Sequence, residues 1–280
     1  GDVRDGGDRL ENLEKMINAV EETQKRGLNR AEHRLHLRCE LPHHTTLPLF
    51  EKLVGREPVS LVSLMDHSPG QRQFANIEKY REYYQGKYSL SDAEMARYEE
   101  EQLALAAQWS QPNRLSIAAM CRDRNIALAS HDDATHDHVR ESHQLGSVIA
   151  EFPTTFEAAE ASRKHGMNVL MGAPNIVRGG SHSGNVAASK LASLGLLDIL
   201  SSDYYPASLL DAAFRVADDE GNSFTLPQAI RLVTKNPASA LNLHDRGEIA
   251  EGKRADLVLA HRKGEHVHID HVWRQGKRVF

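Results

Sequence analysis

Cysteine is scarce in this sequence, since Cys39 and Cys121 are the only two among 280 residues. This scarcity excludes a disulfide-rich scaffold and a zinc site built from Cys-x-x-Cys motifs. Long apolar runs are also lacking: none approaches the roughly 18 residues that a membrane-spanning helix needs, and residues 1–15 have no apolar core of a signal peptide. We therefore expect a cytoplasmic protein that does not enter a membrane.

An excess of positive charge is absent as well. The chain carries 34 lysines and arginines against 39 aspartates and glutamates, which gives a formal net charge of −5. This balance argues against general affinity for nucleic acid or for an anionic membrane surface. An anionic substrate is compatible with it only if basic side chains are concentrated in the pocket. Histidine, with 16 residues, is over-represented, and this enrichment is compatible with a metal site.

Helical and strand-like segments alternate along most of the chain. Hydrophobic periodicity predicts helices over residues 8–26, from 91 towards 109, over 156–164 and over 185–194. Ser91 and Glu94 fit a capping box at the start of the second of these helices. Apolar runs predict strands at residues 33–42, 58–70, 126–133, 147–155, 168–175 and 197–206.

Strands that alternate with helices in this way indicate parallel βα units of an α/β protein. A closed (β/α)8 barrel has eight strands, and the sequence offers six. We therefore expect a TIM-like barrel whose first strands are missing from this chain. The alternative is an open, doubly wound sheet of six strands.

The composition changes after residue 242, where short β-type runs are separated by Gly-Lys and Lys-Gly turns. This change predicts a barrel over residues 1–242 and a small β appendage over residues 243–280. A polar, tyrosine-rich insertion at about residues 71–110 interrupts the barrel. It is either a lid over the substrate or a helical pair that packs on the barrel, and packing is slightly favoured.

Polar side chains stand at the ends of successive predicted strands. In chain order they are Glu40, His67, His131 with Asp132, Asn175 and Asp203. The C-terminal ends of the strands of a parallel barrel meet at one rim. Imidazoles and carboxylates together are ligands for divalent metals such as zinc, manganese or iron. Taken singly, each residue is more typical of a cap or a turn than of a metal ligand, but together they predict one or more divalent ions at this rim.

Two segments near the C-terminus resemble a known family. Residues 232–243, LVTKNPASALNL, and residues 247–260, GEIAEGKRADLVLA, are similar to the C-terminal signature of the amidohydrolase superfamily. In that superfamily the second segment leads into a small β-sandwich that is shared with the N-terminus. The resemblance implies a metal-dependent hydrolase built on a (β/α)8 barrel.

The superfamily pattern also implies roles for individual residues. Asp203 corresponds to the aspartate of strand eight, a metal ligand that is catalytic because it accepts a proton. Glu40 resembles the bridging carboxylate, and His67 and His131 resemble the imidazole ligands. Two departures concern a standard two-metal site. The His-x-His motif of strand one is not in this chain, and Phe152 stands where a histidine is expected at the end of strand six.

Five further segments resemble one branch of the superfamily: SLMDHSPGQRQF, ASHDDATHDHV, AEFPTT, GAPNIVRGGSHSGN and SSDYYPASLL. They are similar to the hydrolases of the carbon–phosphorus lyase pathway, which act in alkylphosphonate breakdown. The resemblance implies hydrolysis of α-D-ribose 1-methylphosphonate 5-triphosphate to the 5-phosphate and pyrophosphate. The expected partner is thus a small phosphorylated ribose, and a homo-oligomer is compatible with the sequence. The alternatives are an amidohydrolase that cleaves a C–N bond, such as a deacetylase or cyclic amidase, and a truncated fragment or scaffold without activity.

Residues 175–185 predict a phosphate site between a strand and a helix. Their glycines let backbone approach a ligand closely, and Arg178 can bind phosphate oxygens through two N–H groups. A flexible Gly/Ser-rich loop is the alternative. Arg72, directly after the strand that carries His67, is a second basic element. The candidate substrate-binding residues are therefore Arg72, Asp132, Asn175, Arg178, Gly180, His182 and Asn185.

Overall fold

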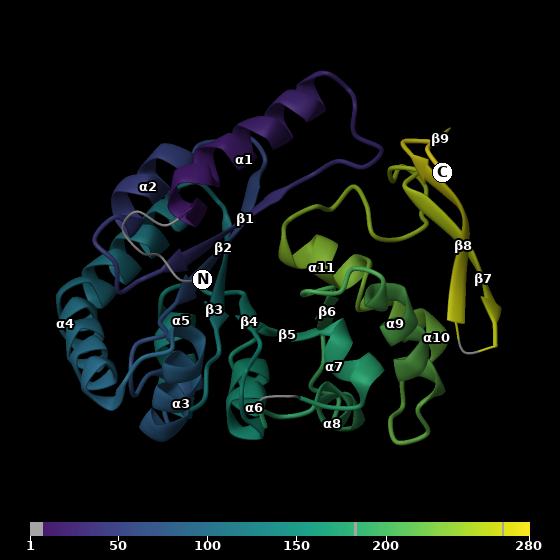
Figure 1. The fold of residues 1–280 in the computed structure, drawn as a ribbon. Helices are drawn as coiled ribbons and strands as arrows, with labels where there is room; N and C mark the ends of the chain where they lie inside the picture. The colour runs from purple at the N-terminus through teal and green to yellow at the C-terminus, as the bar shows by residue number, and fades with distance from the viewer. Residues whose placement is uncertain (1–7, 182–183, 265) are drawn as a thin grey trace.

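The computed structural model describes residues 8–181, 184–264 and 266–280 (Figure 1). Its main sheet has six parallel strands, each hydrogen-bonded to the next in chain order. This order confirms the predicted succession of βα units. The strands are β1 (Leu35–Glu40), β2 (Val59–Met65), β3 (Ala127–His131), β4 (Ile149–Glu151), β5 (Asn168–Gly172) and β6 (Ile199–Ser201).

The sheet is curved but open. Strands β1 and β6 form its two edges and do not pair with each other in the described part of the chain, so the expected barrel is not closed there. Figure 1 shows the strands as an arc, with helices α4, α5, α6 and α8 along its outer side. None of the helices in these residues is both long enough and apolar enough to cross a membrane.

The helices and the short 3-10 helix η1 connect the strands. In chain order they are α1 (Asp8–Lys25), α2 (Thr46–Leu53), η1 (Arg72–Phe74), α3 (Ile77–Tyr88), α4 (Asp92–Asp123), α5 (His136–Gln144), α6 (Phe156–Lys164), α7 (Ala173–Arg178), α8 (Ala188–Ser193), α9 (Ser208–Asp218), α10 (Leu226–Arg231) and α11 (Lys235–Ala240).

Two apolar clusters hold the helices on the sheet. In the first, Val62 and Leu64 of β2 pack with Ile117 of α4. In the second, Met171 of β5 packs with Leu191 of α8. Central strands that are covered on both faces need nearly continuous apolar sequence, and β3 is buried at all five positions. This packing fixes the C-terminal ends of the strands, which carry the polar residues.

Threonines begin the helices that follow β3 and β4. The Thr135 side chain accepts the N–H of His138 and caps α5, and the Thr155 side chain caps α6 in the same way. The predicted capping box of Ser91 and Glu94 is confirmed at α4. That helix extends beyond the predicted end near residue 109, runs through Pro112 and ends at Asp123.

The strand predicted over residues 168–175 is shorter in the structure. Strand β5 ends at Gly172, and helix α7 begins at Ala173 with Pro174 in its first turn. Proline suits the first turn of a helix but removes a ladder hydrogen bond from a central strand. The first part of the expected phosphate loop, up to Arg178, is therefore helical.

The tyrosine-rich insertion packs through its aromatic rings. Tyr80 and Tyr84 of α3 are buried with Phe74 of η1 and Met95 of α4. Tyr80 is only 1% exposed, whereas Tyr83 is 50% exposed. The insertion is therefore anchored by one face of α3.

A small antiparallel sheet follows the six-stranded one, in the region where a β appendage was predicted. It consists of β7 (Leu257–Lys263), β8 (His266–Arg274) and β9 (Lys277–Arg278), in that order. Glu32, in the segment between α1 and β1, forms ion pairs with Arg246 at 3.2 Å and Arg254 at 2.6 Å. These contacts tie the segment before the small sheet to the start of the larger one.

Candidate active site

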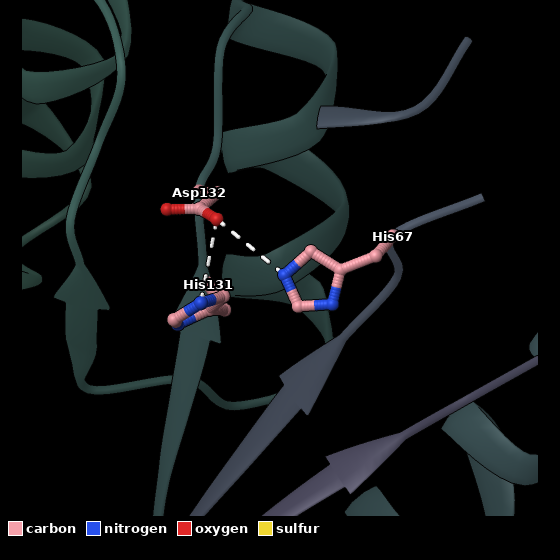
Figure 2. Close-up of side chains that lie close together, drawn as sticks. All are labelled: His67, His131 and Asp132. Carbon is pink, nitrogen blue, oxygen red and sulfur yellow. Dashed lines mark ion pairs between the residues drawn. The ribbon is translucent and has the colours of Figure 1, made fainter. Parts of the chain in front are cut away.

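Two imidazoles face an aspartate at the C-terminal ends of β2 and β3 (Figure 2). The ring centroids of His67 and His131 lie 5.5 Å apart with the rings nearly perpendicular. The Nε2 atoms lie 3.7 Å (His67) and 3.3 Å (His131) from Oδ2 of Asp132. One potential ligand atom from each of the three residues lies within 4.8 Å of the others, so the group could hold a metal ion.

A carboxylate stands behind each ring. Nδ1 of His67 lies 2.9 Å from Oε2 of Glu40, and Nδ1 of His131 lies 2.7 Å from Oε2 of Glu151. A carboxylate behind Nδ1 orients the ring and, in the neutral imidazole, leaves the lone pair on Nε2. Both rings therefore present Nε2 towards Asp132. This is the arrangement found behind metal-binding histidines.

The charges around the rings favour a cation. Burial raises the pKa of Glu151, but the hydrogen bond and charge of His131, with smaller effects of His36 and Arg38, lower it to about 2. Burial also opposes ionisation of Glu40, yet His67 holds its pKa below the usual value. Burial lowers the pKa of His67, but Glu40 and Asp132 outweigh it and raise that pKa to about 9. The space between these carboxylates thus stabilises positive charge.

One face of β1 contributes polar groups to the same site. His36 contacts Oγ of Ser63 at 2.5 Å, and Ser63 Oγ donates to Oε2 of Glu151 at 2.8 Å. Arg38 places an N–H donor 3.2 Å from Nε2 of His131. Alternate residues of a strand share one face, so His36, Arg38 and Glu40 all point to this side of the sheet.

A buried ion cluster holds the residues next to the two site residues His67 and Asp132. Arg114 of α4 pairs with Asp66 at 3.3 Å, and Arg72 of η1 pairs with Asp133. Both arginines also contact Glu141 of α5. Because Asp66 and Asp133 are the chain neighbours of His67 and Asp132, the cluster anchors the strand ends from behind.

The predicted role of Arg72 therefore requires a correction. It was expected to bind substrate, but its side chain is only 4% exposed and does not line the pocket described below. Its backbone has a positive φ of 44°, and its guanidinium is directed at Asp133 and Glu141. The sequence places Arg72 at the correct end of the strand, but its partners lie far away in the chain.

A pocket of about 290 Å³ contains the three donors on one wall and further polar residues on a second wall. The first wall carries His67, His131 and Asp132. The second carries residues of α7, of the segment that follows it and of the turn after β6. The predicted site residues on this second wall are Asn175, Arg178, Gly180, Asn185 and Asp203.

Side-chain contacts order the second wall. Arg178 donates from Nη1 to the hydroxyl of Tyr204 at 2.9 Å, next to Asp203. Oδ1 of Asn175 accepts the N–H of Ala188 at 2.9 Å, so this side chain holds the first residue of α8. A methyl group on Gly172 would lie 3.3 Å from Oδ2 of Asp203. The glycine at the end of β5 thus lets Asp203 approach closely.

Three strand ends turn through left-handed backbone at residues other than glycine. The φ angles are 56° at Asp132, 57° at Phe152 and 48° at Asp203. Such conformations cost about 1 kcal/mol or more, most for bulky side chains, and cluster at functional sites. At each of these corners the chain turns out of its strand, and all three residues line the pocket.

The structure thus brings most predicted site residues together, with several differences. Asp203, which was predicted as a metal ligand, lines the pocket but is outside the three-donor group, and Asp132, which was predicted to bind substrate, belongs to that group. Glu40 contacts His67 but is outside the three-donor group and the pocket lining, and Arg72 lies in the ion cluster. His182 lies outside the described residues. Glu151 and Arg38 were missed, although a glutamate inside the apolar run SVIAEF and an arginine two residues before Glu40 were visible signals.

Similarity to known proteins shows the family of this chain. Residues 29–280 match the model of a family described as "Amidohydrolase family". The chain belongs to this amidohydrolase family. Over all 280 residues it is 89% identical to "Alpha-D-ribose 1-methylphosphonate 5-triphosphate diphosphatase" of Escherichia coli (strain K12), covering 74% of that relative.

The more distant matches include a deaminase and a hydantoinase. Over 125 residues, which are 41% of the chain and 21% of the relative, it is 34% identical to an adenine deaminase of Ligilactobacillus salivarius (strain UCC118). A crystal structure of D-hydantoinase matches 99% of this chain and 74% of its own, with 12% identity and a TM-score of 0.49.

Proposed function

We propose that this chain hydrolyses α-D-ribose 1-methylphosphonate 5-triphosphate to the 5-phosphate and pyrophosphate. The strongest support is its 89% identity, over its whole length, to a relative that bears the name of this activity. The observation in the structure that carries the proposal is the pocket itself. One wall presents two carboxylate-backed imidazoles, and the other presents Arg178 and Asp203.

We further propose that the six parallel strands belong to a (β/α)8 barrel, with residues 1–242 in the barrel and residues 243–280 in a small β domain. Membership of the amidohydrolase family supports the barrel, and the separate three-stranded sheet of β7, β8 and β9 supports the division. The substrate pocket would then lie at the rim formed by the C-terminal strand ends.

The donor set fits a divalent cation such as zinc, manganese or iron, because it combines two imidazole nitrogens with one carboxylate oxygen. His67 and His131 would bind through Nε2 and Asp132 through Oδ2. Glu40 and Glu151 would orient the rings from Nδ1, so Glu40 acts here behind a ligand and not as a bridging ligand. When bound, the cation would supply a Lewis acid that lowers the pKa of a nearby water.

The second wall would handle protons and phosphate charge. Asp203 would accept the proton of the attacking water on a carboxylate oxygen. Arg178 would contact the phosphate oxygens that gain charge as the bond to pyrophosphate breaks. Asn185 and Gly180 line the same wall and would position the phosphates. Asn175 would act indirectly, because its side-chain oxygen is bonded to Ala188.

Substrate choice tests the proposal. The purified chain, stripped of metal and reloaded with zinc, manganese or iron, is offered the ribosyl triphosphate, an N-acyl amino acid and a cyclic amide. We expect pyrophosphate release from the triphosphate and no cleavage of C–N bonds. The opposite preference would identify a C–N hydrolase. If this chain binds no metal and has no activity while a longer version of the protein is active, this chain is an inactive fragment.

A further inference from the structure

A lysine of the tyrosine-rich insertion reaches the glycine-rich segment after α7. A methyl group placed on Gly184 would lie 3.8 Å from Nζ of Lys79, which is on α3. Gly184 is not part of the pocket lining, whereas Ser181 and Asn185 on either side of it are. The ammonium group of Lys79 therefore lies at the margin of the pocket.

The position of Lys79 is fixed by the packing of α3. The Asn76 side chain accepts the N–H groups of Glu78 at 2.8 Å and Lys79 at 3.2 Å, which fixes the start of the helix. One residue later, Tyr80 is buried in the aromatic cluster with Phe74. The side chain of Lys79 itself is exposed.

The same segment is attached to the metal wall. The ring of Phe74 meets the ring of His67 edge to face, with centroids 6.1 Å apart. Its neighbour Gln73 lines the pocket. Residues 73–79 therefore run from the imidazole of His67 to the glycine-rich segment, so this part of the insertion borders the pocket as well as packing on the protein.

The arginines and aspartates that line the pocket balance in charge, so a further cation would help to bind an anionic ligand. Arg38 and Arg178 are matched by Asp132 and Asp203 among the lining residues. A triphosphate brings several negative charges, since each phosphate group carries one to two at neutral pH. In the described part of the chain Lys79 forms no ion pair with a carboxylate, so its charge is available to a ligand.

We propose that Lys79 binds the two outer phosphates of the substrate, which leave as pyrophosphate. This inference rests on the proposed function and adds a residue of the insertion to phosphate recognition. A ligand held at the metal wall reaches Lys79 only if it extends beyond the pocket margin. The outer phosphates are the part of a ribosyl triphosphate that does so when the scissile bond lies near Asp203.

Pyrophosphate binding to the metal-loaded chain tests the assignment by calorimetry. We expect Lys79→Met to weaken the affinity about tenfold, as for the loss of one charge-assisted contact. Lys79→Arg should largely restore it. The matched control is Lys87→Met on the same helix, whose Nζ lies 5.2 Å from the Tyr83 ring centroid; it should bind like the unaltered chain. The KM for the triphosphate should rise in Lys79→Met by a similar factor, with unchanged metal content.

Two results would overturn the assignment. One is equal pyrophosphate affinity in Lys79→Met and Lys87→Met, whether or not both are weakened. The other is an unaltered chain that binds no pyrophosphate at millimolar concentration. Failure to hydrolyse the triphosphate is a separate result: it would refute the proposed function, while the pyrophosphate titration would still decide whether Lys79 is a phosphate contact.

Discussion

The two walls of the pocket are built in different ways. On the metal wall His131 is 4% exposed and Asp132 is 6% exposed, and the rings have a carboxylate behind them. On the opposite wall Arg178 is exposed and donates to the hydroxyl of Tyr204. Buried, fully paired groups are held in one geometry, whereas exposed side chains adapt to a ligand. Changes to the first wall should therefore affect metal content or folding, and changes to the second should affect substrate affinity.

The largest effect is expected from His131→Asn. The shorter amide removes the Nε2 ligand atom and the imidazole that pairs with Glu151, so the metal should be lost. We expect activity to fall at least about 1,000-fold, since the cation supplies several kcal/mol of transition-state stabilisation. Metal analysis with the turnover rate checks this. The control is His143→Asn, on the exposed side of α5. If His131→Asn keeps its metal, His131 is not a metal ligand.

Arg72→Met should chiefly destabilise the fold. It removes the arginine that pairs with the buried Asp133 and leaves Glu141 facing Arg114. Removing one partner of a buried ion pair costs about 3–5 kcal/mol. Denaturant unfolding measures the loss, and Arg140→Met on the surface of α5 provides the comparison. A normal unfolding free energy together with a raised KM would return Arg72 to the list of substrate contacts.

Glu151→Gln tests the support behind His131. The amide removes a negative charge and weakens the hold on Nδ1, and we expect metal affinity to fall about 10- to 100-fold, as for other residues that orient metal ligands. Competition with a chelator gives the affinity directly. Glu157→Gln, an exposed position on α6, should leave it unchanged. Equal affinities in the two variants would mean that Glu151 does not orient the ring.

Arg178→Ala should give the smallest of these effects and the one confined to substrate. We expect KM for the triphosphate to rise about tenfold through the loss of one charge-assisted contact, with normal metal content and stability. Steady-state kinetics and metal analysis together separate these quantities. Arg97→Ala, exposed on α4, is the matched change. Lost metal in Arg178→Ala would contradict the distinction between the walls.

The order of the six strands could be predicted because each is an apolar run between helices, and buried parallel strands require such runs. The polar residues at their ends were found for the same reason. Glu151 was missed because β4 has only three residues and the backbone turns at Phe152. The strand was expected to continue to residue 155, which placed its end at the wrong residues.

Other features depend on contacts that sequence spacing does not reveal. Whether Arg72 faces a ligand or a carboxylate is decided by Asp133 and Glu141, which lie in a different βα unit. Arg38 is a different case. The alternation in β1 placed Leu35 and Leu37 on one side, so it could have been inferred that Arg38 shares the opposite side with Glu40. A role for Lys79 could be inferred only from the structure, in which its Nζ lies close to Gly184.

The left-handed corners at Asp132, Phe152 and Asp203 set limits for protein engineering. A glycine there would relax the backbone, and at Phe152 a design method that rewards stability alone would favour it. It would also give the chain several directions in which to leave its strand. The orientation of the functional groups would then no longer be set by the backbone, so a more heat-resistant variant obtained in this way would be a poorer catalyst.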